Sequence, residues 1–81
     1  HSDNVQRQIE VSDEVQFVFK AMENLPEKQR MVMQLRDVEQ FEFHEISEML
    51  DINETAIRVN LSRARKAVRD ELIENYNYGI S

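Results

Sequence analysis

The stretch that decides the fold runs from Phe43 to Leu72 and reads FHEISEML (43–50), DIN (51–53) and ETAIRVNLSRARKAVRDEL (54–72). Apolar residues recur at helical spacing on both sides of the DIN interruption. A short helix, a three-residue turn and a longer helix with a basic exposed side are typical of a helix-turn-helix motif, whose second helix enters the major groove of DNA. We place this motif at residues 43–69. A small helical bundle with another function would show the same outline, so geometry alone leaves both interpretations open.

Charge is distributed unevenly along the chain of 81 residues, whose formal net charge is −6. The window from Thr55 to Arg69 holds five cations and no acid, so removing its +5 from −6 leaves −11 on the rest of the chain. A basic helix on an acidic body predicts two surfaces, one for a polyanion and one for a different partner. The alternative is a basic helix face that is merely solvated.

Two helices are predicted before the motif. Ser12 is a good N-cap for a first helix that runs to about Asn24. Pro26 fits the first position of a second helix, which we expect to end between Asp37 and Glu39. The predicted buried stripes of the four helices are Val15, Val18, Phe19 and Met22; Met31, Val32, Leu35 and Val38; Phe43, Ile46, Met49 and Leu50; and Ile57, Leu61, Ala64, Val68 and Leu72. Five of these residues are expected in one shared core: Leu35, Ile46, Leu50, Ile57 and Leu61. Phe17 and Met33 fall off the stripes and are predicted to face a partner.

Composition favours one all-α domain. One glycine and one proline are too few for the turns of an all-β fold, and the absence of cysteine excludes disulfides, thiolate metal sites and cysteine nucleophiles. No apolar run reaches the ~20 residues that cross a membrane, and no signal-peptide pattern opens the chain. We therefore expect a soluble, cytoplasmic protein with no membrane partner. Residues 1–11 are predicted to be a linker or a disordered end, 12–76 the helical domain and 77–81 a tail.

Four short motifs carry a resemblance to a known family. They are Leu-Pro at 25–26, Glu-Ile-Ser and Leu-Asp-Ile at 45–47 and 50–52, and Arg58, Leu61 and Arg-Ala-Arg at 63–65. Together they resemble region 4 of the bacterial sigma-70 family, most closely that of the extracytoplasmic-function (ECF) sigma factors. Helix-turn-helix response regulators share the middle motifs but usually lack the Arg-Ala-Arg ending. The resemblance implies a four-helix helix-turn-helix domain of the sigma region 4 type, similar to a winged helix without the wing.

The chain departs from the family pattern at five positions. Gln40 stands where glycine is usual, and Glu42 replaces a serine or threonine N-cap, which is expected to cost roughly 1 kcal/mol. Asp51 replaces the turn glycine, although aspartate tolerates the left-handed conformation better than most residues. Val59 and Asn60 stand where serine and arginine are frequent, so the promoter sequence read is expected to differ from the best-known ones.

Candidate DNA-binding residues lie on the side of the second motif helix that faces away from its apolar stripe, at about 100° per residue. Arginine can bond guanine O6 and N7, and Val59 can contact a thymine methyl, although a surface valine without a function is the alternative. Arg63 is expected to read a base and Lys66 to contact a phosphate. Arg65 and Arg69 lie beside the stripe, where ion pairs with neighbouring acids or phosphate contacts are expected. The predicted DNA-binding residues are Arg58, Val59, Asn60, Ser62, Arg63 and Lys66, and the predicted phosphate contacts are His44, Arg65 and Arg69.

Catalytic or metal chemistry has little support in the sequence. His44 lies near Glu45 and Glu48, but a lone imidazole among surface carboxylates is more often a plain surface residue than a metal ligand. No positioned nucleophile accompanies the acids between residues 39 and 54. We therefore expect no enzyme, metal or cofactor.

The resemblance also implies partners. It implies that the domain recognises the promoter −35 element, that it docks on RNA polymerase core through the β-subunit flap, and that an anti-sigma factor inhibits it. A separate N-terminal part would read the −10 element. The alternative is a helical protein-interaction domain, for polymerase or anti-sigma docking, that does not bind DNA on its own.

Overall fold

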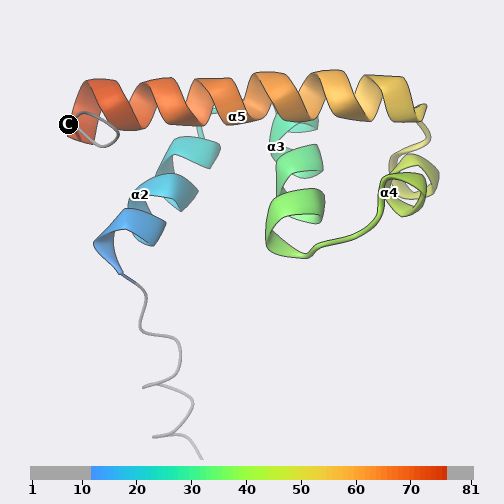
Figure 1. The fold of residues 1–81 in the computed structure, drawn as a ribbon, viewed down its shortest axis with the longest axis horizontal. Coiled ribbons are helices and arrows are strands. Elements are labelled where there is room, and N and C mark those ends of the chain that lie inside the picture. The colour runs from blue at the N-terminus through green and yellow to red at the C-terminus, as the bar shows by residue number, and fades with distance from the viewer. Residues whose placement is uncertain (1–11, 77–81) are drawn as a thin grey trace, which may run out of the picture.

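A computed structural model describes residues 12–76 of the chain (Figure 1). The helices in this part are α2 (Asp13–Met22), α3 (Glu27–Met33), α4 (Phe43–Leu50) and α5 (Glu54–Tyr76), and a π-helical turn, η1 (Gln34–Val38), follows α3 directly. No strand occurs within residues 12–76, so the predicted all-α, four-helix fold is confirmed for them. The predicted linker, 1–11, and tail, 77–81, lie outside the described residues.

Helix α5 is the axis on which the other helices pack. Figure 1 shows α2, α3 and α4 on one side of α5, with α4 beside its first turns and α2 toward its C-terminal end. All three contact α5. The opposite side of α5 is covered by none of the other described helices, so one long face of this helix is open along most of its length (Figure 1).

Local signals explain where the first helices begin and end. The Ser12 hydroxyl oxygen accepts a hydrogen bond from the Val15 N–H at 3.3 Å, as expected of an N-cap. Helix α2 ends at Met22, two residues before the predicted end. Pro26 lies one position outside α3, with an extended ψ of 149°, and not at the first helical position as predicted. Proline is tolerated there because an N–H at a helix start has no partner within the helix.

The second predicted helix changes its hydrogen bonding after Met33. Over Gln34–Val38 the bonds close on the fifth residue instead of the fourth, and the last of them runs from the Glu39 N–H to the Gln34 carbonyl at 3.0 Å. Such turns are rare inside helices and frequently lie at functional sites. The turn ends at Val38, within the predicted interval.

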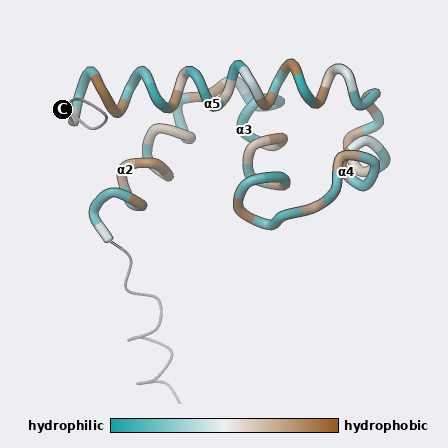
Figure 2. Tube along the Cα trace, viewed as in Figure 1, coloured by the Kyte–Doolittle hydropathy of each residue, from teal (hydrophilic) through white to brown (hydrophobic). Residues whose placement is uncertain are grey.

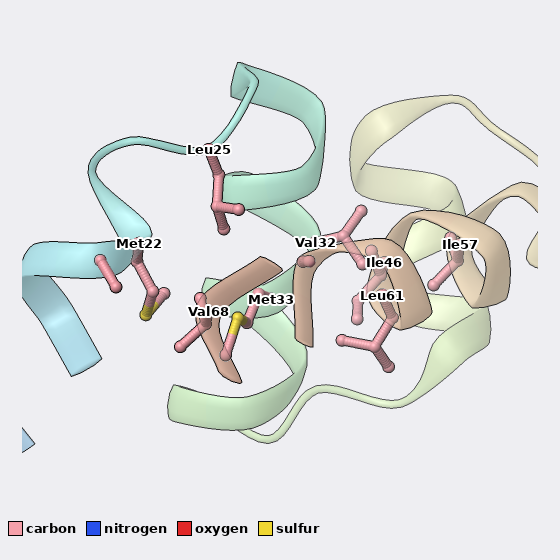
Figure 3. Close-up of a cluster of buried hydrophobic side chains, with 10 residues drawn as sticks. Met22, Leu25, Val32, Met33, Ile46, Ile57, Leu61 and Val68 are labelled. Carbon is pink, nitrogen blue, oxygen red and sulfur yellow. The ribbon is translucent and has the colours of Figure 1, made fainter. Parts of the chain in front are cut away.

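The core lies between α5 and the three shorter helices (Figure 3). Of the five residues predicted to share it, Ile46, Ile57 and Leu61 are buried, whereas Leu35 and Leu50 pack half-buried at its edge. The labelled buried side chains of Figure 3 are Met22, Leu25, Val32, Met33, Ile46, Ile57, Leu61 and Val68.

Some stripe predictions were wrong. Met33, predicted to face a partner, is only 8% exposed, because α3 packs closely along α5 and covers positions beside its stripe. Met49 was predicted to lie on a buried stripe but is 49% exposed, since the short α4 buries only the row that contains Ile46. Val15, Phe19 and Val38 are likewise exposed. Phe17 is half-buried.

Candidate nucleic-acid interface

The helix-turn-helix geometry coincides with the sequence prediction. Helix α4 ends at Leu50, the turn comprises residues 51–53, and α5 begins at Glu54. Asp51 adopts the predicted left-handed conformation, with φ of 58° and ψ of 46°. The Asn53 side-chain oxygen accepts a hydrogen bond from the Ala56 N–H at 2.7 Å and so caps the first turn of α5. The turn therefore sets the start of the basic helix through both its backbone and its cap.

The segment before α4 compensates in part for its unusual residues. The Glu45 carboxylate accepts a hydrogen bond from the Glu42 N–H at 2.8 Å, which is the return half of a capping box. The loss of a serine or threonine cap at position 42 is thus partly offset. Gln40 has a positive φ of 65°, a conformation that costs an L-residue roughly 1–2 kcal/mol and that glycine adopts freely. The family preference for glycine at this position has its physical reason here.

The exposed side of α5 presents most of the predicted DNA-binding residues together. Arg58, Val59, Ser62, Arg63 and Lys66 are all exposed. Asn60 differs, because it is half-buried and its side-chain amide donates a hydrogen bond to the Ala56 carbonyl of the same helix at 2.8 Å. The structure therefore brings five of the six predicted residues to one open face and leaves Asn60 at its border.

The basic residues of α5 differ in their partners. Arg65 donates from Nε to Asp37 Oδ2 at 2.9 Å, and its Nη2 bonds the other carboxylate oxygen. This pair with η1 raises the pKa of Arg65 above its ordinary value, chiefly through the hydrogen bond to Asp37. Arg65 therefore forms the predicted ion pair with a neighbouring acid.

Lys66 is paired with an acid of its own helix, whereas Arg63 is paired with none of the described residues. Lys66 Nζ donates to Asp70 Oδ2 at 2.6 Å, one turn along the same helix, and this hydrogen bond holds the pKa of Asp70 below its ordinary value. Arg63 makes no hydrogen bond or ion pair with any residue between 12 and 76. The Arg63 guanidinium can therefore bind an external acceptor without breaking a hydrogen bond or ion pair to any of these residues.

A basic hollow runs along the side of α5 next to α4. Its lining residues are Phe43, Arg58, Leu61, Ser62, Arg65, Lys66 and Arg69. Four of them are cations and two, Phe43 and Leu61, are apolar, and such a group of cations attracts anionic groups. Two of the three predicted phosphate contacts, Arg65 and Arg69, line this hollow, whereas His44 lies outside it as an exposed residue of the first turn of α4.

Phe43 and Arg36 lie beside the candidate interface, and sequence reasoning did not single them out for a role there. The Phe43 ring lies under two guanidinium groups, with Arg36 Cζ at 5.0 Å and Arg58 Cζ at 5.1 Å from its centroid. Arg58 Nη2 also lies 3.7 Å from Glu54 Oε1. No local sequence motif predicts the cluster of Arg36, Phe43 and Arg58, because its members come from η1, α4 and α5.

Within residues 12–76, no group of three or more histidine, cysteine, aspartate or glutamate residues is arranged to hold a metal ion. None of the helices in the same part of the chain has the length and apolar character needed to span a membrane.

Comparison with known proteins agrees with this geometry. The family model described as "Sigma-70, region 4" matches residues 18–68, which include α3, α4 and most of α5. The chain belongs to the sigma-70 region 4 family. This family is one of transcription-factor domains and not of enzymes, and it supports a role in promoter recognition. The resemblance predicted from the sequence is confirmed.

Curated relatives of this region 4 domain are ECF sigma factors. The "ECF RNA polymerase sigma-E factor" of Escherichia coli (strain K12), of Salmonella typhimurium (strain LT2) and of Shigella flexneri are each 33% identical to it over 57 residues. The match covers 70% of this chain but only 30% of each relative. The chain therefore spans less than a third of the length of these relatives. No solved structure matches the chain.

Proposed function

We propose that this region 4 domain binds the promoter −35 element as the DNA-binding module of an ECF sigma factor, with α5 in the major groove. The observation that supports it best is the open face of α5, on which Arg58, Val59, Ser62, Arg63 and Lys66 are exposed together. The tube in Figure 2 shows hydrophilic and hydrophobic residues alternating along α5, as expected of a helix that packs on one side only. A major groove about 12 Å wide admits one such helix.

Each exposed residue has a chemical role in this proposal. Arg63, which has no partner in the described structure, forks onto guanine O6 and N7. Val59 contacts a thymine methyl, and Ser62 bonds a base edge or a phosphate. Lys66 leaves Asp70 for a phosphate, which exchanges one hydrogen-bonded anion for another.

Three further residues, His44, Arg65 and Arg69, are proposed to contact DNA phosphates beside the base-reading residues. His44 lies at the first turn of α4, where the exposed N–H groups and the helix dipole favour an anion. Arg69 lines the basic hollow beside Lys66. Arg65 contributes positive charge to the same hollow while its guanidinium is held by Asp37, so its contribution is expected to be the smallest of the three.

The partners proposed for the domain are promoter DNA, RNA polymerase core through the β-subunit flap, and an anti-sigma factor, with the bacterial cytoplasm as the place of action. The chain outside the basic window carries a formal charge of −11, which disfavours contact of that part with DNA phosphates. Exposed Val15 and Phe19 give α2 an apolar surface for protein contacts. The −10 element would be read by a part of the protein that this chain does not span.

A salt titration of duplex binding tests the proposal. The 81-residue chain is first used to select duplexes from a random-sequence pool, and its affinity for an enriched and a scrambled duplex is then measured between about 50 and 200 mM salt. We expect a preference for the enriched duplex and a fall of log K with log[salt] of about 0.9 per phosphate contacted. No enrichment and no salt-dependent binding would favour the helical protein-interaction domain instead.

A further inference from the structure

The feature that carries this inference is the stack of two arginines on one aromatic ring, where η1, α4 and α5 meet. Arg36 Cζ and Arg58 Cζ lie 5.0 and 5.1 Å from the centroid of the Phe43 ring. Both distances are within the ~6 Å at which a ring face attracts a cation. One ring therefore links a residue of η1 to a proposed DNA contact on α5.

The Phe43 ring is held in place by contacts other than the one with Arg58. Phe43 is half-buried and packs against the hydrophobic core. Arg36, which lies over the same ring, donates from Nη1 to the Phe41 carbonyl at 2.9 Å and lies 3.8 Å from the Glu42 carboxylate. The ring is thus held by the core and by a guanidinium that is itself bonded to the preceding loop.

Arg58 is the more exposed of the two arginines, since its side chain is 59% exposed and that of Arg36 is 35% exposed. Among residues 12–76, the Arg58 guanidinium makes an ionic or cation–π contact with the Phe43 ring and with the Glu54 carboxylate, which lies 3.7 Å from Nη2, and with no other group. A long exposed arginine loses much rotamer freedom when it binds, and a contact that limits this freedom beforehand lowers the cost of binding.

Whether the Phe43 ring positions Arg58 for DNA or blocks it depends on which part of the guanidinium meets the ring. An aromatic ring meets the face of a guanidinium, whereas bases and phosphates are bonded through its N–H edge. A guanidinium that meets the Phe43 ring through its face keeps its donor edge open. Glu54 lies at 3.7 Å from a single nitrogen of that edge, beyond hydrogen-bond distance.

We infer that Phe43 is a positioning residue for DNA reading: its ring holds the Arg58 guanidinium in the orientation that meets a base edge in the major groove. The inference rests on the proposed function, and it adds a specificity-determining residue that does not itself touch DNA. Arg36 supports the ring from the other element of the stack.

Replacing Phe43 with leucine tests the inference, because leucine keeps an apolar side chain against the core and removes the ring face. Base preferences of the 81-residue chain and of Phe43→Leu are measured by selection from a random duplex pool, and affinities are measured on the duplex that the parent enriches. We expect binding about three- to tenfold weaker and a relaxed preference at one base position, the same one that Arg58→Ala relaxes.

Matched variants separate this effect from a general loss of structure. Phe43→Tyr keeps the ring and should restore the parent profile. Phe41→Leu removes a neighbouring half-buried ring over which no cation of residues 12–76 lies, and it should leave base preference unchanged. In an Arg58→Ala background, Phe43→Leu should cause no further loss of binding or preference, because the residue it positions is absent.

A measurement without DNA tests the contact itself. Protons of the Arg58 side chain should show ring-current shifts in the NMR spectrum of the parent, and Phe43→Leu should abolish them. Absence of these shifts in the parent overturns the inference even if Phe43→Leu does not fold.

The binding results then have distinct meanings. An unchanged profile in Phe43→Leu, or tighter binding, overturns positioning while parental duplex binding still supports the proposed function. If the parent selects no duplex at all, the proposed function fails and the inference fails with it.

Discussion

The buried face and the open face of α5 differ in how strongly packing restricts their residue types. On the buried face, Ile57, Leu61, Ala64 and Val68 are at most 4% exposed and pack against three other helices. On the open face, polar and apolar side chains alike reach solvent and no described helix restricts their identity. Packing therefore fixes the residue types of the buried face, whereas it leaves those of the open face free to vary.

The cations of α5 outside the buried face also differ in whether an acid is paired with them. Arg65 is held by Asp37 and Lys66 by Asp70, whereas Arg63 has no such partner among residues 12–76. A cation that must leave an acid contributes less to binding than one that is free. Substitutions on the two faces should consequently separate stability from binding, and substitutions within the open face should separate one cation from another.

The largest effect is expected for Leu61→Ala on the buried face. Removing this side chain should lower the free energy of unfolding by about 2–5 kcal/mol, since it leaves a cavity between α5 and the other helices. Chemical denaturation measures the loss, and Leu72→Ala, at a half-buried position of the same helix, should cost less. Equal stability of parent and Leu61→Ala would show that the buried face has been assigned to the wrong residues.

The next effect concerns Arg63 and Lys66 on the open face. Arg63→Ala should cost about 1–3 kcal/mol of binding to the enriched duplex and relax preference at one position. Lys66→Ala should weaken all duplexes alike and flatten the salt slope by about one unit, because a phosphate contact carries no sequence information. Affinities on enriched and scrambled duplexes at several salt concentrations distinguish the two, and identical behaviour of both variants would contradict the assignment.

A smaller effect is expected for Val59, the exposed apolar residue of this face. Val59→Ser should change stability by no more than about 0.5 kcal/mol, as surface substitutions usually do, but should shift the preferred base opposite it. Thymine and uracil differ only by the methyl group that Val59 is proposed to contact. Parent affinity should therefore fall when uracil replaces thymine at that position, and Val59→Ser should lose this difference. Equal parental affinity for both duplexes would leave Val59 as a plain surface residue.

The smallest effect is a pKa change at the Lys66–Asp70 pair. The hydrogen bond from Lys66 lowers the pKa of Asp70, so the stability it adds is present above the ordinary aspartate value of about 3.9 and is lost as pH falls through the lowered pKa. Lys66→Ala should raise the pKa of Asp70 toward its ordinary value, as followed by NMR titration of the carboxyl carbon. Arg63→Ala is the control, and an unchanged Asp70 in Lys66→Ala would show that the pair does not persist in solution.

Much of the fold could be predicted from the sequence because its signals are local. The bounds of α4, the left-handed Asp51 and the buried face of α5 follow from helical periodicity and turn chemistry, and the structure confirms them. Burial of Met33 and exposure of Met49 could not be predicted, because they depend on how closely one helix lies along another.

The candidate interface also has features that the sequence predicted and features that it did not. Periodicity correctly predicted the exposure of five of the six predicted DNA-binding residues, all but Asn60. For Arg65, which lies beside the apolar stripe, an ion pair or a phosphate contact was expected, and the structure shows the ion pair with Asp37. The hydrogen bond of Asn60 to its own helix and the stack on Phe43 were not predicted. The stack joins side chains from three elements and has no signature in any one segment.

The π-helical turn after α3 also has a consequence for insertions and deletions. A bond that closes on the fifth residue encloses one residue more than an α-helical bond, so the chain after Met33 is out of phase with the helix before it. Arg36 and Asp37 both lie in this shifted segment, and they reach Phe43 and Arg65 respectively. Segment length, independently of residue type, thus sets which side chains of η1 reach the helix-turn-helix motif, and losing a single residue there would redirect both contacts at once.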